Sequence, residues 1–246
     1  MCRFGGFGDL LMASSVLPGL RRQGFHVTLM TTPKGQELLR EDPHIDDWWI
    51  QDEDQVPNAE LPTYWEALST RFDRFVNLSE SVEGTLLAVP GRANHAWPDE
   101  MRQRRLGSVN YLDFIHEIAQ VPRGPMVRFY TSEAERQWAR DLRAELGDES
   151  FVVLWSLSGS SLHKAYPWTD NVVARLMTDC PRAKVVFVGD TACQILEMGW
   201  EEEPRVICKS GVWSIRESLA FLEVADCVVG PETGVLNAAG FLDVPK

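Results

Sequence analysis

Two kinds of hydrophobic pattern alternate along the chain: short continuous apolar runs, and longer segments with apolar residues three or four positions apart. The first pattern is typical of strands covered on both faces, and the second of amphipathic helices. The first half is expected to contain strands at residues 1–4, 26–30, 48–50 and 72–78. It is expected to contain helices at residues 10–20, 33–39 and 111–120. This order predicts a parallel sheet with right-handed crossovers.

The second half repeats the pattern. Strands are expected at residues 151–155, 184–189, 206–207 and 227–230, and helices at 132–146, 168–177, 215–222 and 234–240. Ser132 and Glu135 have the spacing of a capping box at the start of the first of these helices. The segment Pro122-Arg123-Gly124-Pro125 is interpreted as a linker. We therefore predict an α/β protein with two Rossmann-like domains, 1–125 and 126–246.

The composition of the chain disfavours some classes of ligand and some cellular locations. With 36 acidic and 24 basic residues, the 246-residue chain has a net charge of −12, which disfavours nucleic acid as a ligand. No apolar run is long enough to span a bilayer and the N-terminus lacks a signal-peptide core, so a cytoplasmic protein is expected. Eight carboxylates and no Lys or Arg lie between Glu41 and Glu60, where a solvated loop region is expected. The basic run Arg102–Arg105 is interpreted as a solvated helix face, with an anionic acceptor or a peripheral membrane contact as the alternative.

Cysteine and histidine do not have the spacing of a metal site. The five cysteines are widely spread and form no C-x-x-C pair. His116-Glu117 begins like H-E-x-x-H, but Gln120 stands where the second histidine belongs. We therefore predict neither a disulfide framework nor a metal held by His or Cys.

The first candidate site is the glycine turn from Gly5 to Asp9, between an expected strand and a helix. Glycines at such a turn let the backbone approach a ligand, and helix N-terminal amides favour anions. Read as a dinucleotide fingerprint, Gly6 and Gly8 are followed by Leu11 in place of the third glycine, so the fingerprint fails. Asp9 has two open interpretations, a helix cap or a functional carboxylate.

Two further candidates follow strands of the second half. One loop contains Ser158, Ser160, Ser161 and Lys164, whose hydroxyls and ammonium are suited to a diphosphate, although the Walker spacing is absent. The other contains Glu232, Thr233, Gly234 and Asn237, at the start of a helix of small residues. Either could be an ordinary surface turn. Both come at the carboxyl ends of their strands, where open α/β sheets bind ligands.

In combination, these segments resemble the family 9 glycosyltransferases, the heptosyltransferases of lipopolysaccharide biosynthesis. The resemblance rests on Gly8-Asp9, on residues 37–46 and 72–87, on the Gly, Ser, Lys and Pro-Trp series at 158–168, and on Glu232-Thr233-Gly234. It implies a GT-B fold, in which the N-terminal half binds the acceptor and the C-terminal half binds a nucleotide-sugar donor. It also implies inverting transfer of a heptose-like sugar, without metal or cofactor, from a donor such as an ADP-sugar to a saccharide or glycolipid.

The resemblance also implies roles for residues. Asp9 corresponds to the proposed general base, and Gly6 and Gly8 to the acceptor-side loop. Donor-binding roles fall to Ser158, Ser160, Ser161, Lys164, Asp190, Glu232, Thr233, Gly234 and Asn237. Glu232 and Asn237 replace the Asp and His that the family commonly has there, which leaves the donor open.

The sequence leaves two other functions open. A nucleotide or nucleotide-sugar binding domain without catalysis is the main alternative, and an NAD-dependent oxidoreductase is disfavoured by Leu11. The family comparison further implies that the second domain is unfinished at residues 240–246, where another strand and closing helices are expected.

Overall fold

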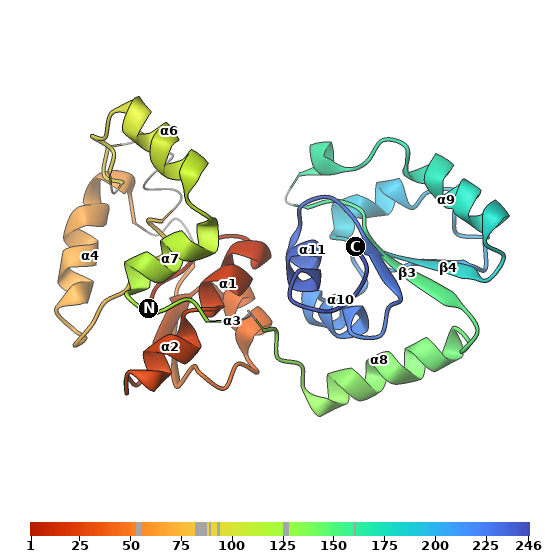
Figure 1. Cartoon of the computed structure of the whole chain (residues 1–246), viewed down its shortest axis with the longest axis horizontal. Helices are drawn as coiled ribbons and strands as arrows, with labels where there is room; N and C mark the ends of the chain where they lie inside the picture. The colour runs from red at the N-terminus through yellow and green to blue at the C-terminus, as the bar shows by residue number, and fades with distance from the viewer. Residues whose placement is uncertain (53–55, 82–87, 89, 93, 125–127, 160) are drawn as a thin grey trace. The chain divides into compact units, whose positions relative to one another are not determined.

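The computed structural model describes residues 1–52, 56–81, 88, 90–92, 94–124, 128–159 and 161–246 (Figure 1). The chain divides into two compact units: Met1–Gly5 with Asp9–Val127, and Gly6–Gly8 with Arg128–Lys246. The boundary expected at residue 125 lies outside the described residues. No helix in the described part of the chain has the length and apolar character needed to cross a bilayer.

The first part of the chain forms a small parallel sheet with helices around it. Its elements are α1 (Phe7–Ser14), α2 (Leu17–Arg22), β1 (Thr28–Thr31), α3 (Pro33–Leu39), β2 (Asp47–Ile50), η1 (Asn58–Glu60), α4 (Leu61–Ser69), α6 (Asp99–Ser108) and α7 (Tyr111–Ala119). Strands β1 and β2 pair in parallel, with Thr28 opposite Asp47. Helix α7 begins at the cap Asn110, whose side chain accepts a hydrogen bond from the backbone N–H of Leu112.

Three expectations for this unit are wrong. Residues 1–4 and 72–78 form no strands; Cys2 makes only isolated parallel bridges, to Met30 and to Asn77. The single helix expected at 10–20 is two helices, because Pro18 in the first turn of α2 has no N–H to donate and its ring would clash with the preceding turn. Helix α4 is not predicted, although its apolar residues Leu61 and Leu68 have helical spacing.

Among the described residues, each charged segment of the first unit contains one buried residue within a segment that is otherwise exposed or half-buried, as expected. Asp42 is buried and accepts hydrogen bonds from the backbone N–H and the Nδ1 of His44, at 3.0 and 2.8 Å. Burial raises the pKa of Asp42, and these bonds oppose the rise. Arg102 is also buried, on α6, where it donates to the carbonyl oxygens of Trp97 and His95. A charged residue in the sequence therefore does not by itself indicate a solvated face.

The second unit follows the expected pattern closely. Its elements are α8 (Glu133–Glu145), β3 (Phe151–Ser156), η2 (Leu162–Lys164), α9 (Thr169–Asp179), β4 (Ala183–Val188), η3 (Thr191–Leu196), β5 (Val206–Cys208), α10 (Ile215–Leu222), β6 (Cys227–Val229) and α11 (Gly234–Ala239). Every strand and helix expected here is confirmed within two residues at each end. The capping box of Ser132 and Glu135 is present, and Ser214 and Glu217 form a second one.

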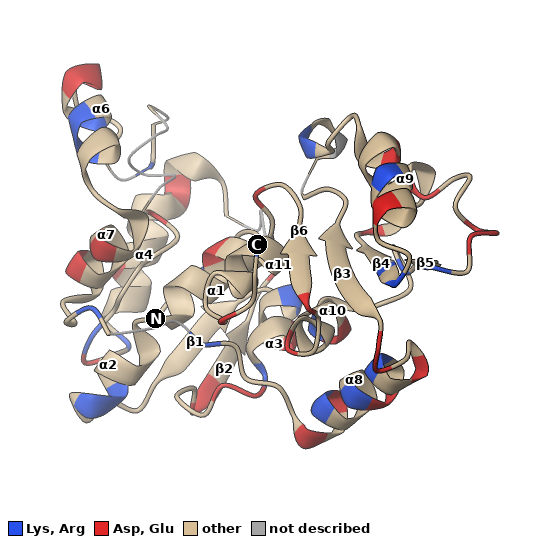
Figure 2. Cartoon of the chain, turned by 45° about the vertical axis from the view of Figure 1, so that its right-hand side comes forward, with Lys and Arg blue, Asp and Glu red and all other residues tan. Residues whose placement is uncertain are grey.

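The four strands of the second unit form one parallel sheet in the order β5-β4-β3-β6, seen side by side in Figure 2. Successive side chains of a strand point to opposite faces. On one face Val153 and Trp155 pack with Val173 and Met177 of α9. Val152, on the other face, is equally buried. Helices therefore cover both faces, as the unbroken apolar runs indicate.

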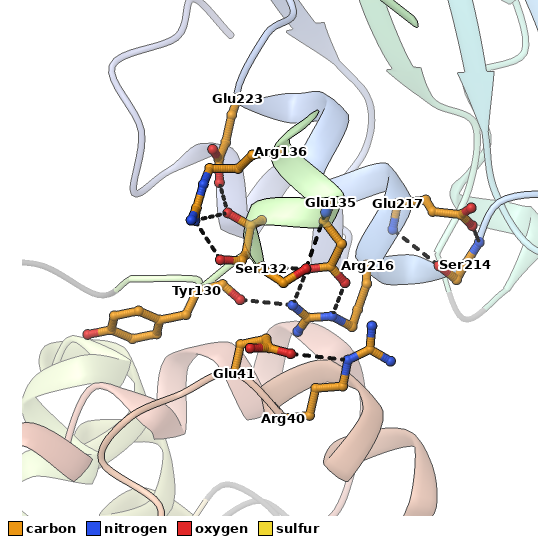
Figure 3. Close-up of polar contacts among 11 residues, drawn as sticks. Arg40, Glu41, Tyr130, Ser132, Glu135, Arg136, Ser214, Arg216, Glu217 and Glu223 are labelled. Atoms are coloured by element: carbon orange, nitrogen blue, oxygen red, sulfur yellow. Dashed lines mark hydrogen bonds and ion pairs between the residues drawn. The ribbon is translucent and has the colours of Figure 1, made fainter. Parts of the chain in front are cut away.

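Helices α8 and α10 are joined by an ion pair (Figure 3). Arg216 of α10 donates from Nε to Oε1 of Glu135 and from a terminal nitrogen to Oε2, both at 2.6 Å. The same nitrogen of Arg216 donates to the carbonyl oxygen of Tyr130 at 2.9 Å, and the guanidinium lies over the ring of Phe129. The capping-box carboxylate of Glu135 thus also anchors the neighbouring helix.

Candidate functional site

The strand order of the second unit contains a reversal between β3 and β6. From β3 the chain continues to β4 and then β5 on one side, and β6 returns to the other side of β3. The register pairs Trp155 of β3 with Val229 of β6, so both strands end at the same edge of the sheet. Open α/β sheets bind ligands at the carboxyl ends of the strands where the strand order reverses in this way.

Two glycines lie where the β3 and β6 loops approach each other. A Cβ on Gly230, just after β6, would lie 2.7 Å from the carbonyl oxygen of Ser156, so only glycine permits this approach. A Cβ on Gly159, in the β3 loop, would lie 3.4 Å from the carbonyl oxygen of Glu232. The segments that sequence analysis selected separately are therefore neighbours in the fold.

Lys164 and Glu232 form the charged centre of this edge. The ammonium of Lys164 lies 3.1 Å from Oε2 of Glu232 and also donates to the Glu232 carbonyl oxygen at 3.4 Å. The amide of Asn237 donates to the other carboxylate oxygen of Glu232 at 2.8 Å. The hydrogen bond from Asn237 and the contact with Lys164 lower the pKa of Glu232. Glu232 is therefore held as a carboxylate between a cation and an amide.

Thr233 has a structural role at the same edge. Its hydroxyl accepts a hydrogen bond from the backbone N–H of Leu236 at 3.2 Å and lies 3.1 Å from the hydroxyl of Ser156. The residue is buried and is the N-cap of α11, which begins at Gly234. A phosphate contact by this hydroxyl would have to compete with the cap. Ser156, which sequence analysis did not select, is the last residue of β3.

The serines of the β3 loop mainly stabilise the loop itself. The Ser158 hydroxyl donates to the carbonyl oxygen of Ser161 at 2.7 Å, and the Ser161 hydroxyl lies 2.6 Å from Nδ1 of His163. Ser160 lies outside the described residues. These contacts shape the turn that leads to Lys164 in η2.

Asp190 follows β4, the neighbour of β3 on the side away from β6. Its carboxylate accepts a hydrogen bond from the backbone N–H of Cys193 at 3.1 Å and caps η3. The residue is exposed, and its carboxylate also interacts with the thiol of Cys193. Gly189 before it is required for packing, because a Cβ there would lie 2.6 Å from the side chain of Cys193.

The glycine turn of the first half leads into α1 and places Asp9 in its first turn. The Asp9 carboxylate lies 3.1 Å from the guanidinium of Arg3, which is buried and also donates to the carbonyl oxygen of Leu78 at 3.0 Å. Gly5 has φ of 108°, a conformation that favours glycine. Arg3 was missed by the sequence analysis, although a charge within an apolar segment directly before the turn was a usable signal.

The described residues contain no group of three or more His, Cys, Asp or Glu side chains arranged to hold a metal ion. Within the same residues, all five cysteines are free thiols, and burial raises the pKa of Cys2 to about 12.

Comparisons with known proteins come from structure alone, since no protein-family model and no curated protein matches the sequence. A glycosyl transferase family 9 protein from Veillonella parvula matches with a TM-score of 0.69 and 14% identity, over 97% of this chain and 76% of that one. ADP-heptose LPS heptosyltransferase II of E. coli matches with a TM-score of 0.65 and 16% identity, over 99% and 82%. This chain shares the fold of these glycosyltransferases.

The E. coli heptosyltransferase WaaC with ADP is a further match, with a TM-score of 0.64 and 11% identity, over 99% of this chain and 84% of that one. The α/β fold with parallel sheets expected from the hydrophobic pattern is thus confirmed, and it matches that of GT-B glycosyltransferases. At these identities the similarity establishes the fold and leaves the chemistry to be argued from the residues.

Proposed function

We propose that the chain is an inverting, metal-independent glycosyltransferase that moves a heptose-like sugar from a nucleotide-sugar to a saccharide or glycolipid. The observation that carries the proposal is Lys164, a cation at the strand-order reversal of a glycosyltransferase fold. Among the structures with this fold, one contains ADP, and a more distant match, S. aureus MnaA with a TM-score of 0.51, contains UDP. These ligands support a nucleoside diphosphate as the recognised group.

On the donor side, Lys164 is proposed to bind the diphosphate. Its ammonium would stabilise the charge that develops on the leaving nucleoside diphosphate. Ser158 and Ser161 are proposed to assist from the β3 loop, and Thr233 and Gly234 from the β6 loop. Asp190, which is exposed after β4, is proposed to accept a hydrogen bond from a ribose hydroxyl.

On the acceptor side, Asp9 is proposed as the general base. The acceptor hydroxyl oxygen attacks the anomeric carbon, its proton passes to the Asp9 carboxylate, and the bond from that carbon to the phosphate oxygen breaks. The electron pair leaves with the nucleoside diphosphate. Arg3 would fix the orientation of the carboxylate through its 3.1 Å contact, and Gly6 and Gly8 would leave room for the acceptor.

Sugar transfer by the Asp9→Asn variant tests the catalytic part of this proposal. Asparagine cannot accept the proton, so we expect transfer to fall by about 100-fold or more while nucleotide affinity stays unchanged. Asp113→Asn is a matched control, because Asp113 is exposed and paired with Arg123 elsewhere in the same unit. Equal transfer rates in wild type and Asp9→Asn would remove Asp9 from the mechanism. Nucleotide binding without transfer by wild type would favour a non-catalytic binding domain.

A further inference from the structure

The Lys164–Glu232 pair presents a difficulty for any anion that binds at this edge. The charge on Lys164 is already balanced by the Glu232 carboxylate at 3.1 Å. Asn237 holds the other carboxylate oxygen at 2.8 Å, so the side chain is fixed at both oxygens. A phosphate group approaching the ammonium would meet a pair with no net charge. The Glu232 carboxylate would occupy the position beside the ammonium that a phosphate oxygen has to take.

We infer that Glu232 is an internal counter-ion of Lys164, which a diphosphate must displace in order to bind. This role rests on the proposed function and specifies how the donor site selects its ligand. Both partners keep access to solvent, with 33% of the Lys164 side chain and 69% of the Glu232 side chain exposed. An exposed pair contributes little to folding stability, so it separates at small cost.

The pair makes the site selective for ligand charge. The Glu232 carboxylate is tethered beside the ammonium, which gives it a high effective concentration. A singly charged anion that replaces the carboxylate puts no more negative charge beside the ammonium than was there before. A diphosphate puts more negative charge there than the carboxylate did. The site should therefore reject monoanions such as acetate and accept nucleoside diphosphates and nucleotide-sugars.

The same competition would favour product release. When the glycosyl bond to phosphate breaks, the departing nucleoside diphosphate carries one more negative charge than it had in the nucleotide-sugar. Lys164 alone would hold this product more tightly than the donor. Return of the Glu232 carboxylate to Lys164 opposes that retention, because the carboxylate and the product compete for one ammonium.

Calorimetric titration of the whole chain with ADP and with UDP tests this role. Glu232→Gln keeps the shape of the side chain and removes its charge, so we expect it to bind the diphosphate about fivefold more tightly than wild type. The gain should shrink as salt is added. In a Lys164→Ala background, Glu232→Gln should change affinity by less than about twofold, since the counter-ion then has no partner.

Glu149→Gln is the matched control for net charge. Glu149 is 90% exposed, pairs with Arg182 and precedes β3, at the opposite end of the strand from Lys164. We expect its diphosphate affinity to equal that of wild type, and an equal gain in this variant would overturn the specific role of Glu232.

The other outcomes of the titration separate the two proposals. Unchanged affinity in Glu232→Gln would overturn the counter-ion role and leave the donor site standing. Weaker binding would show that Glu232 contacts the ligand and would also overturn it. If neither wild type nor Glu232→Gln binds ADP or UDP, the proposed donor site fails and the inference fails with it.

Discussion

Two cation–carboxylate pairs of the second unit join elements far apart in sequence, yet they differ in nearly every physical respect. Arg216 and Glu135 make two hydrogen bonds of 2.6 Å, and their side chains are 2% and 12% exposed (Figure 3). Lys164 and Glu232 make one side-chain contact of 3.1 Å, and both remain accessible to solvent.

The Arg216–Glu135 pair is a structural pair, and the Lys164–Glu232 pair is an exchangeable pair whose carboxylate a ligand can replace. The guanidinium of Arg216 has its donors directed at Glu135 and the Tyr130 carbonyl, so a ligand has no access and the pair holds α8 to α10. The ammonium of Lys164 has one carboxylate partner at an exposed edge of the sheet, where a diphosphate can replace that partner. The accessibility of a pair, more than its presence, indicates whether it serves folding or binding.

The largest expected effect is on folding stability, in Arg216→Met. This change leaves the Glu135 carboxylate buried without its cation, so we expect a loss of about 3–5 kcal/mol in the free energy of unfolding. Urea denaturation followed by circular dichroism measures it. Arg182→Met removes an exposed pair and should cost less than about 1 kcal/mol. Equal costs in the two variants would contradict the distinction drawn between the pairs.

The next effect is the acid sensitivity of the structural pair. Burial opposes ionisation of Glu135, but hydrogen bonds from Arg216 and Ser132 outweigh it and lower its pKa from 4.5 to about 2. A depressed pKa stabilises the fold above the unfolded value and loses that stabilisation as pH falls from about 4.5 towards about 2. The stability difference between wild type and Glu135→Gln should therefore narrow across this range in urea titrations. A difference independent of pH would contradict the assignment.

A smaller effect on folding stability is expected at Thr233, which lies next to Glu232 of the exchangeable pair. Thr233→Ala removes the cap of α11 and the contact with the Ser156 hydroxyl, so we expect a loss of about 1 kcal/mol in unfolding free energy. Thr233→Ser keeps the hydroxyl and should lose less than half as much. If alanine and serine are equally destabilising in thermal denaturation, the cap does not depend on the hydroxyl.

The two units also differ in how far sequence predicts them. The second unit consists of unbroken apolar strands such as 151–156 and clear helical stripes, which local pattern identifies directly. In the first unit, Cys2 and Asn77 take part only in isolated bridges, and Pro18 divides a continuous apolar stripe into two helices. Burial of Asp42 depends on the fold around it, which local pattern does not encode.

The sequence identifies most residues of the candidate site, but it does not show which of them are in contact. Lys164 and Glu232 were both selected from their loops, but 68 positions separate them. Their contact follows from the pairing of β6 with β3 on the side away from β4, which no local pattern specifies. Arg3, in contrast, lies only six positions before Asp9, and its charge directly before the glycine turn was a usable signal that was not selected.

Calorimetric titration of wild type and Lys164→Ala with ADP, UDP and NAD tests the central claim, that the β3–β6 edge binds a nucleoside diphosphate. We expect saturable binding of ADP or UDP by wild type, and at least about tenfold weaker binding by Lys164→Ala, since a charge-assisted contact to phosphate is lost. NAD should not bind. Equal affinity in the two proteins, or binding of NAD, would contradict the account.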